Sequence, residues 1–205
     1  MRSLASVSSQ FVAWIALLRC AGVLFAVARQ GLRLKRTTVT KWGWTETLAA
    51  PEPFIMMAFA YFLITRSHLH AGEPILHAAV AIVGGVLAAV GISIWLWGFA
   101  TIPSLSSGHY VLARQDLITS GAFGFVRHPI YLGVFVLWLA LAAASASIVT
   151  LAVTIVYVVP IYIFYIRSEE RMMLDHFGAS YREYQGRTGM VFPRHRRHRS
   201  DRGEP

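Results

Sequence analysis

The chain has 205 residues, of which 56% are hydrophobic and only 14% are charged, whereas a soluble domain carries about 25% charged residues. This composition excludes an ordinary water-soluble protein. Basic residues outnumber acidic ones by 19 to 10, and the excess lies between and after the apolar segments. The single cysteine, Cys20, excludes an internal disulfide and a cysteine-based zinc cluster, and the length predicts one compact domain.

Five apolar segments approach the length of about 20 residues that a helix needs to cross a bilayer. They comprise residues 11–28, 54–65, 75–102, 130–146 and 148–166. The second is the shortest, because prolines precede it, although residues 47–50 could lengthen it. The last two are joined by so short a connection that we expect a helical hairpin. The pattern predicts an all-α, polytopic membrane protein with about five transmembrane helices, followed by cytosolic C-terminal helices.

The distribution of Lys and Arg predicts the orientation, because cytoplasmic loops are enriched in both. Sixteen of them lie in segments 29–52, 103–129 and 167–205. We therefore predict that the N-terminus lies outside and the C-terminus in the cytoplasm. Arg19 lies inside the first apolar segment, where a charge facing lipid is costly, and we favour a packing role for it over a role in a site. Its position also argues against a cleaved secretory signal over residues 1–28.

The C-terminal tail, residues 194–205, reads RHRRHRSDRGEP, which predicts a disordered basic segment attracted to anionic lipid head groups. We expect residues 1–193 to form a single membrane domain whose catalytic part is 101–193. The expected partners are membrane lipids and no nucleic acid, and the oligomeric state stays open. Two histidine clusters are better explained by solvated segments than by a metal site; they are His195 with His198, and His68, His70 and His77 with Glu73.

The predicted cytoplasmic segment 114–133 reads RQDLITSGAFGFVRHPIYLG. Pro129 suits the first turn of a helix, where its missing N–H costs nothing. His128 would then lie near the N-cap, beside backbone amides that can bind an anion such as a carboxylate. Tyr131 follows one turn later, and Gly133 allows a backbone or a ligand to come close. This segment is therefore the first candidate for a functional site.

The second candidate segment, residues 167–193, reads RSEERMMLDHFGASYREYQGRTGMVFP. Several of its residues share one helix face: Glu170, Leu174, Phe177, Tyr181 and Tyr184. An amphipathic interfacial helix explains the tyrosines, with a break or close packing at Gly178. It does not explain Arg167, Glu169 and Glu170 at the end of a span, where charges need partners or a function.

These two segments resemble the isoprenylcysteine carboxyl methyltransferase family of integral-membrane methyltransferases. The resemblance covers about the last 90 residues. It rests on Ser120-Gly121, on Arg127-His128-Pro129-x-Tyr131-x-Gly133, and on Glu169-Glu170-x-x-x-Leu174-x-x-Phe177-Gly178-x-x-Tyr181-x-x-Tyr184 ending in Pro193. It implies that S-adenosylmethionine enters from the cytosol into a pocket formed by the last two spans and the C-terminal helices. A lipophilic or prenylated substrate would reach the methyl group laterally from the membrane.

The resemblance also implies the roles of individual residues. The residues expected to bind the cofactor are His128, Pro129, Tyr131, Gly133, Glu169, Glu170 and Tyr181. The expected catalytic residues are Arg167, Glu170 and His128. Arg167 could hold a carboxylate acceptor, whereas His128 or Glu170 could take the proton of a phenol or thiol. Met190 stands where many relatives have arginine, so that charge contact is missing or moved to Arg187.

Four acceptor classes stay open, namely the carboxylate of a prenylcysteine-like or other lipid acid, a phenolic lipid, a lipid thiol and a phospholipid amine. An NADPH-dependent membrane sterol-type reductase is an alternative enzyme, since the same short motifs occur more loosely there. A small non-catalytic membrane or lipid-binding protein is the alternative outside enzymes. A soluble methyltransferase is excluded, because no strand is followed by a glycine-rich turn and a helix.

Overall fold

The computed structural model describes residues 4–34, 44–66, 75–102 and 116–194, and all regular elements in these ranges are helices. They are α1 (Leu4–Leu34), α2 (Trp44–Ala49), α3 (Glu52–Arg66), α4 (Ile75–Thr101), α5 (Ala122–Phe125), α6 (Pro129–Ser145), α7 (Ile148–Val153), the π-helical turn η2 (Thr154–Val158), α8 (Val159–Phe177) and α9 (Ala179–Arg187). The predicted all-α fold is confirmed. The basic tail beyond Arg194 and most of the histidine cluster before α4 lie outside the described residues.

Four stretches of helix are long and apolar enough to cross a membrane: Leu4–Phe25, Thr47–Thr65, Ala78–Thr101 and Ile148–Phe177. The second predicted span reaches this length because α2 extends it, as residues 47–50 suggested. The shorter apolar helix is α6, whose 17 residues rise about 25 Å at 1.5 Å per residue. The polytopic membrane fold is therefore confirmed, while the orientation of the termini stays a prediction.

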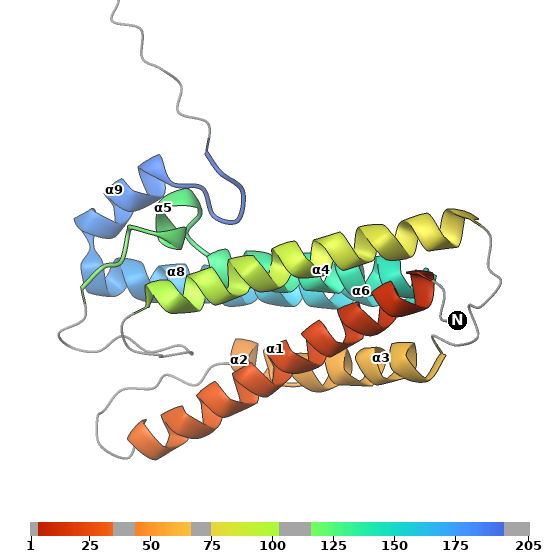
Figure 1. Ribbon diagram of the computed structural model, residues 1–205. Helices are drawn as coiled ribbons and strands as arrows, with labels where there is room; N and C mark the ends of the chain where they lie inside the picture. Colours follow the sequence, from red (N-terminus) through yellow and green to blue (C-terminus); the bar gives the residue numbers. More distant parts are fainter. Residues whose placement is uncertain (1–3, 35–43, 67–74, 103–115, 195–205) are drawn as a thin grey trace, which may run out of the picture.

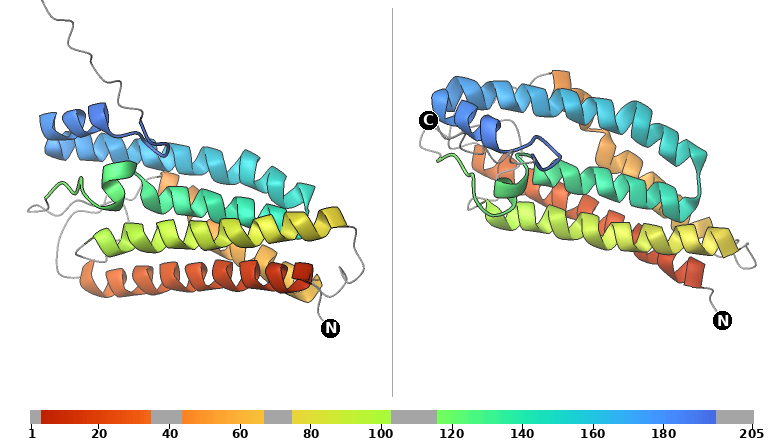
Figure 2. Two further views of the ribbon diagram at one scale, coloured as in Figure 1. Left: turned by 45° about the horizontal axis from the view of Figure 1, so that its top comes forward. Right: turned by 90° about the horizontal axis from the view of Figure 1, so that it is seen from above.

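The long helices run side by side in alternating directions (Figure 1). Figure 2 shows α8, α6, α4 and α1 following one another across the bundle, and α3 packs on α1. The short helices α5 and α9 lie together at one end, where α6 begins and α8 ends. The hairpin between α6 and α7 lies at the other end, near the N-terminus. The two predicted functional segments therefore meet at the α5–α9 end.

Close packing of α4 on α6 depends on glycines that face each other. A Cβ added at Gly133 would lie 2.8 Å from the carbonyl oxygen of Gly91 and 2.9 Å from Cβ of Trp95. Small residues allow such close backbone approach between membrane helices. Gly133 does allow a backbone to come close, as predicted, and that backbone belongs to α4.

The α6–α7 hairpin and the long helix after it follow from local signals. Ala146 turns the chain with φ 45°, and the Ser147 side chain accepts a hydrogen bond from the Thr150 amide, which confirms the predicted hairpin. The helix continues past the predicted end at residue 166 to Phe177. It ends at Gly178, whose φ is 55°, in the left-handed region that favours glycine. The predicted break at Gly178 is confirmed.

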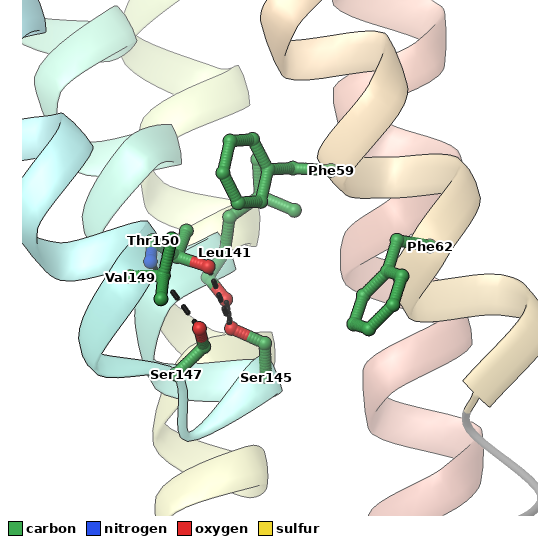
Figure 3. A pocket seen from close by; sticks show the side chains of 7 residues that line it. All are labelled: Phe59, Phe62, Leu141, Ser145, Ser147, Val149 and Thr150. Atoms are coloured by element: carbon green, nitrogen blue, oxygen red, sulfur yellow. Dashed lines mark hydrogen bonds between the residues drawn. The ribbon is translucent and has the colours of Figure 1, made fainter.

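An apolar pocket lies between α3 and the α6–α7 hairpin, lined by Phe59 and Phe62 on one side (Figure 3). The serine hydroxyl groups that line it form hydrogen bonds within the hairpin. Ser147 caps α7, and Ser145 donates to the carbonyl of Leu141. The pocket lies at the end of the bundle opposite α5 and α9, so it is remote from both predicted functional segments.

Candidate functional site

The start of α6 is built as the sequence predicts. His128 is the N-cap residue of α6, and Pro129 occupies the first turn. The chain before Pro129 pairs with the segment after α9, since the amides of Arg127 and His128 donate to the carbonyls of Gly189 (2.8 Å) and Met190 (3.0 Å). The C-terminal segment therefore holds His128 in place, and Met190 contributes its backbone to this contact.

Arg127 connects this turn to α8 and to the end of α9. Its Nε and Nη2 lie 2.7 Å and 2.6 Å from Oε1 of Glu170. Its Nη1 donates to the carbonyls of Thr188 and Gln185. Both charged side chains are about nine-tenths buried. A buried ion pair is stable only if its geometry offsets the cost of removing both charges from water. The guanidinium of Arg127 meets this condition, because it binds Glu170 of α8 and two carbonyls at the end of α9.

Glu170 is fully engaged by its neighbours. Oε1 accepts from Arg127 and lies 3.1 Å from Nε2 of His128, and Oε2 accepts from the side-chain amide of Gln185 at 3.0 Å. A carboxylate only accepts hydrogen bonds, so His128 carries a proton on Nε2. When the imidazole is neutral, its Nδ1 is therefore an acceptor.

Glu169 differs from its neighbour because one of its oxygens is unsatisfied. Oε2 is buried and has no hydrogen-bond partner in the described part of the chain. It lies 3.7 Å from Nδ1 of His128, which is too long for a hydrogen bond. A buried acceptor without a donor costs about 1–3 kcal/mol. This unsatisfied oxygen beside the imidazole forms a place for an N–H or O–H donor from a ligand.

Aromatic rings form the membrane side of this cluster. The Tyr131 ring lies beside Glu169 and has its centroid 5.7 Å from that of His128. It also contacts Tyr162 (5.5 Å) and Tyr165 (5.7 Å) of α8. Aromatic pairs at such distances pack favourably. The rings exclude water on the inner side of the cluster.

Two tyrosines of α9 cover the cluster from the other side. Tyr181 is buried close to both glutamates, and Tyr184 donates to the Phe123 carbonyl of α5 at 2.6 Å. Burial raises the pKa of Tyr181 and raises the pKa of Tyr184 to about 12. Both phenols therefore stay protonated near neutral pH and can donate hydrogen bonds.

The structure brings together most of the predicted site residues, namely His128, Pro129, Tyr131, Glu169, Glu170 and Tyr181. Two others lie apart from them. Gly133 faces α4, and Arg167 is exposed on α8. The functional roles of all these residues stay predictions.

Sequence reasoning gave no role to Arg127, although it quoted this residue as part of a motif. The available signal was the need of two adjacent buried glutamates for a counter-charge. Gln185 had no such signal, since its contact with Glu170 depends on how α9 folds back. Among the described residues, no group of three or more His, Cys, Asp or Glu side chains is arranged to hold a metal ion.

Comparison with known families gives a match over about half of the chain, which includes much of this cluster. The model of the phospholipid methyltransferase family matches residues 79–180. The chain belongs to this family. The match begins within α4, continues through α8 and includes the motif residues His128, Glu169 and Glu170, while α1, α2 and α3 precede it. The resemblance inferred from the motifs is confirmed at this level.

Three curated relatives are similar to parts of the chain. Methanethiol S-methyltransferase 1 of Bradyrhizobium diazoefficiens is 44% identical over 73 residues, which are 35% of this chain and 24% of the relative. The cobalt-zinc-cadmium resistance protein CzcN of Cupriavidus metallidurans is 33% identical over 97 residues (46% and 44%). The protein-S-isoprenylcysteine O-methyltransferase of Saccharomyces cerevisiae is 28% identical over 95 residues (43% and 38%). The matches span less than half the length of each relative.

Proposed function

We propose that this protein is an S-adenosylmethionine-dependent methyltransferase that acts on a lipophilic, membrane-embedded acceptor at the cytoplasmic side. The observation that supports it most is the buried Oε2 of Glu169, which has no hydrogen-bond partner in the described part of the chain and lies 3.7 Å from Nδ1 of His128. The two residues come from the two motif segments and lie within the family match.

The residues of the cluster fit S-adenosylmethionine chemically. The cofactor carries an ammonium group and ribose hydroxyls, which can supply the donor that Oε2 of Glu169 lacks. Tyr181 keeps a phenolic proton that can donate to an acceptor of the ligand. We therefore assign cofactor binding to these three residues together with Tyr131. The bound cofactor supplies a methyl group activated by a sulfonium.

The protein orients the reacting groups, excludes water from the site and takes up the proton that a thiol or phenol acceptor loses. The contacts of Arg127 with Glu170, and of Glu170 with His128, fix the imidazole with Nδ1 toward the cluster. The rings around Tyr131 keep the membrane side dry, which favours transfer to a weak nucleophile. Nδ1 of neutral His128 can accept the proton of a thiol or phenol. A carboxylate acceptor needs no base, and Arg167 would hold it.

The names of two relatives support a narrower range of acceptors. One is named for S-methylation of methanethiol and the other for O-methylation of protein S-isoprenylcysteine. For this chain we propose a lipophilic thiol or carboxylic acid that enters from the bilayer. The N-terminus would lie outside, with the catalytic end and the basic tail facing cytoplasmic lipids.

Calorimetric titration of the detergent-purified protein tests the cofactor assignment. We expect one molecule of S-adenosylmethionine to bind per chain, with weaker binding in His128→Ala. NADPH serves as the control ligand and should not bind. Preferential binding of NADPH would support the reductase, and binding of neither ligand would support a non-catalytic membrane protein.

A further inference from the structure

A second ionic cluster lies inside the bundle, away from the proposed cofactor site. Arg19 of α1 and Glu52 at the start of α3 form an ion pair of 2.7 Å between Nη1 and Oε2. Their side chains are 3% and 1% exposed. Neither residue lies in the family match, which begins at residue 79. The pair therefore joins the two N-terminal helices within the membrane part of the molecule.

Both carboxylate oxygens of Glu52 also accept hydrogen bonds from side chains of other helices. Trp138 of α6 donates its indole N–H to Oε1 at 2.6 Å, and Tyr162 of α8 donates its hydroxyl to Oε2 at 2.9 Å. Arg19 in turn donates from Nη2 to the oxygen of Tyr162 at 3.3 Å, while its Nε has no partner in the described structure. The hydroxyl of Tyr162 is thus fixed by two charged groups.

The ring of Tyr162 connects this cluster to the proposed site. It packs on Tyr131 at 5.5 Å and edge-on against Phe135 at 5.9 Å. Tyr131 in turn contacts the ring of His128 and lies beside Glu169. Large aromatic side chains thus bridge α6 and α8 from the ion pair to the cofactor residues. A shift of Tyr162 would move Tyr131, because packed side chains transmit displacement.

We propose that the Arg19–Glu52 pair is a positioning element for the reaction, acting through the hydroxyl of Tyr162 on the ring of Tyr131. This inference rests on the proposed function, because Tyr131 is assigned to the cofactor site. The N-terminal helices thereby contribute to a site whose motifs all lie in the C-terminal half. Arg19, Glu52 and Tyr162 are separate from the residues assigned to the cofactor, and they would act through Tyr131.

A purely structural role explains the pair less well. Buried ion pairs replaced by apolar residues of similar size often cost nothing or even stabilise a protein, because desolvation offsets the attraction. Packing of α1 on α3 alone would therefore be served by apolar side chains. Two charged partners hold a hydroxyl more firmly than neutral ones, because hydrogen bonds to charged groups are stronger. Tyr162 is the hydroxyl that both charges contact.

The test is Tyr162→Phe, which removes the hydroxyl and keeps the ring. The matched control is Ser9→Ala, since Ser9 also places a buried hydroxyl between helices, donating to the Ala144 carbonyl of α6 at 3.1 Å. The first readout is kcat for methyl transfer. The second is the 19F NMR signal of Tyr131 in protein labelled with 3-fluorotyrosine, assigned by its loss in Tyr131→Phe. The thermal midpoint of each variant is measured alongside.

We expect kcat of Tyr162→Phe to fall about tenfold or more, as small misplacements of positioning groups do, with a shifted or broadened Tyr131 signal. Ser9→Ala should keep kcat and the signal at a similar thermal midpoint. Glu52→Gln should move the Tyr131 signal in the same direction. This variant is read by NMR alone, so it is informative even if its activity is lost. Either wild-type kcat or an unchanged Tyr131 signal in Tyr162→Phe would overturn the inference. A wild-type protein that neither binds nor uses S-adenosylmethionine would overturn the proposed function itself.

Discussion

Within the described ranges, the buried pairs Arg19–Glu52 and Arg127–Glu170 join different helices, and their surroundings differ in what is left unsatisfied. In the Arg19–Glu52 pair, both carboxylate oxygens accept hydrogen bonds from protein donors. At the α5–α9 end, Arg127 and Gln185 satisfy the two oxygens of Glu170 in the same way, but the adjacent Glu169 keeps a buried oxygen without a donor. A saturated carboxylate holds helices together, whereas an unsatisfied one next to an imidazole acceptor marks the place of a ligand.

The largest expected effect comes from breaking the interior pair on one side. Glu52→Met should lower the free energy of unfolding by about 3–5 kcal/mol, because it leaves the Arg19 cation buried and uncompensated. The double variant Arg19→Met/Glu52→Met should regain most of this loss. Unfolding by SDS titration in mixed micelles measures both. A single variant as stable as wild type would show that the pair does not stabilise the interior.

Replacement of Gly133 tests whether this glycine serves packing or the cofactor. Gly133→Ala should lower stability by about 1–3 kcal/mol, because the new Cβ meets α4 at 2.8–2.9 Å. The folded fraction should bind S-adenosylmethionine with unchanged affinity. Gly186→Ala is the control, since its Cβ would meet nothing within 4 Å. Weaker binding at undiminished stability would instead assign Gly133 to the cofactor pocket.

The two adjacent glutamates should respond in opposite ways. Glu169→Gln should leave thermal stability unchanged or raise it, because its amide can donate to Nδ1 of His128. It should weaken cofactor binding about tenfold, the equivalent of one hydrogen bond to a charged group. Glu170→Gln should lower stability, since Arg127 loses its counter-charge. Thermal unfolding combined with calorimetry separates these outcomes, and identical behaviour of the two variants would remove the distinction between the glutamates.

The smallest effect is expected at Arg167, which is exposed on α8. Arg167→Lys keeps the charge and loses the planar fork that grips a carboxylate. Cofactor affinity should stay at the wild-type value. Turnover should fall only if the acceptor is a carboxylate, so assays with lipophilic thiol and acid substrates distinguish the acceptor classes. A change in cofactor affinity would place Arg167 inside the cofactor site.

Local patterns in the sequence predict much of this molecule. Apolar runs of bilayer length mark the helices, and Pro129 and Gly178 mark where α6 begins and α8 ends. The adjacency of His128 to the predicted N-cap also follows from local rules. The motif segments could therefore be recognised before their contacts were known.

Features that depend on tertiary contacts could not be predicted in the same way. The role of Glu52 cannot be predicted from the sequence, because its partners Arg19, Trp138 and Tyr162 are on three other helices. Whether Gly133 faces another helix or a ligand depends on how α6 packs on α4. The unequal roles of Glu169 and Glu170 depend on Arg127, which only the folded C-terminal end brings to Glu170.

Transfer of labelled methyl groups tests the central claim most directly. Purified protein in liposomes is incubated with methyl-labelled S-adenosylmethionine and a membrane lipid extract that contains thiol and acid lipids. We expect label in the lipid fraction with wild type and with Gly186→Ala, and about a hundredfold less with His128→Ala, the effect of losing a positioned acid–base group. Absence of label with wild type, or equal labelling by wild type and His128→Ala, would contradict the account.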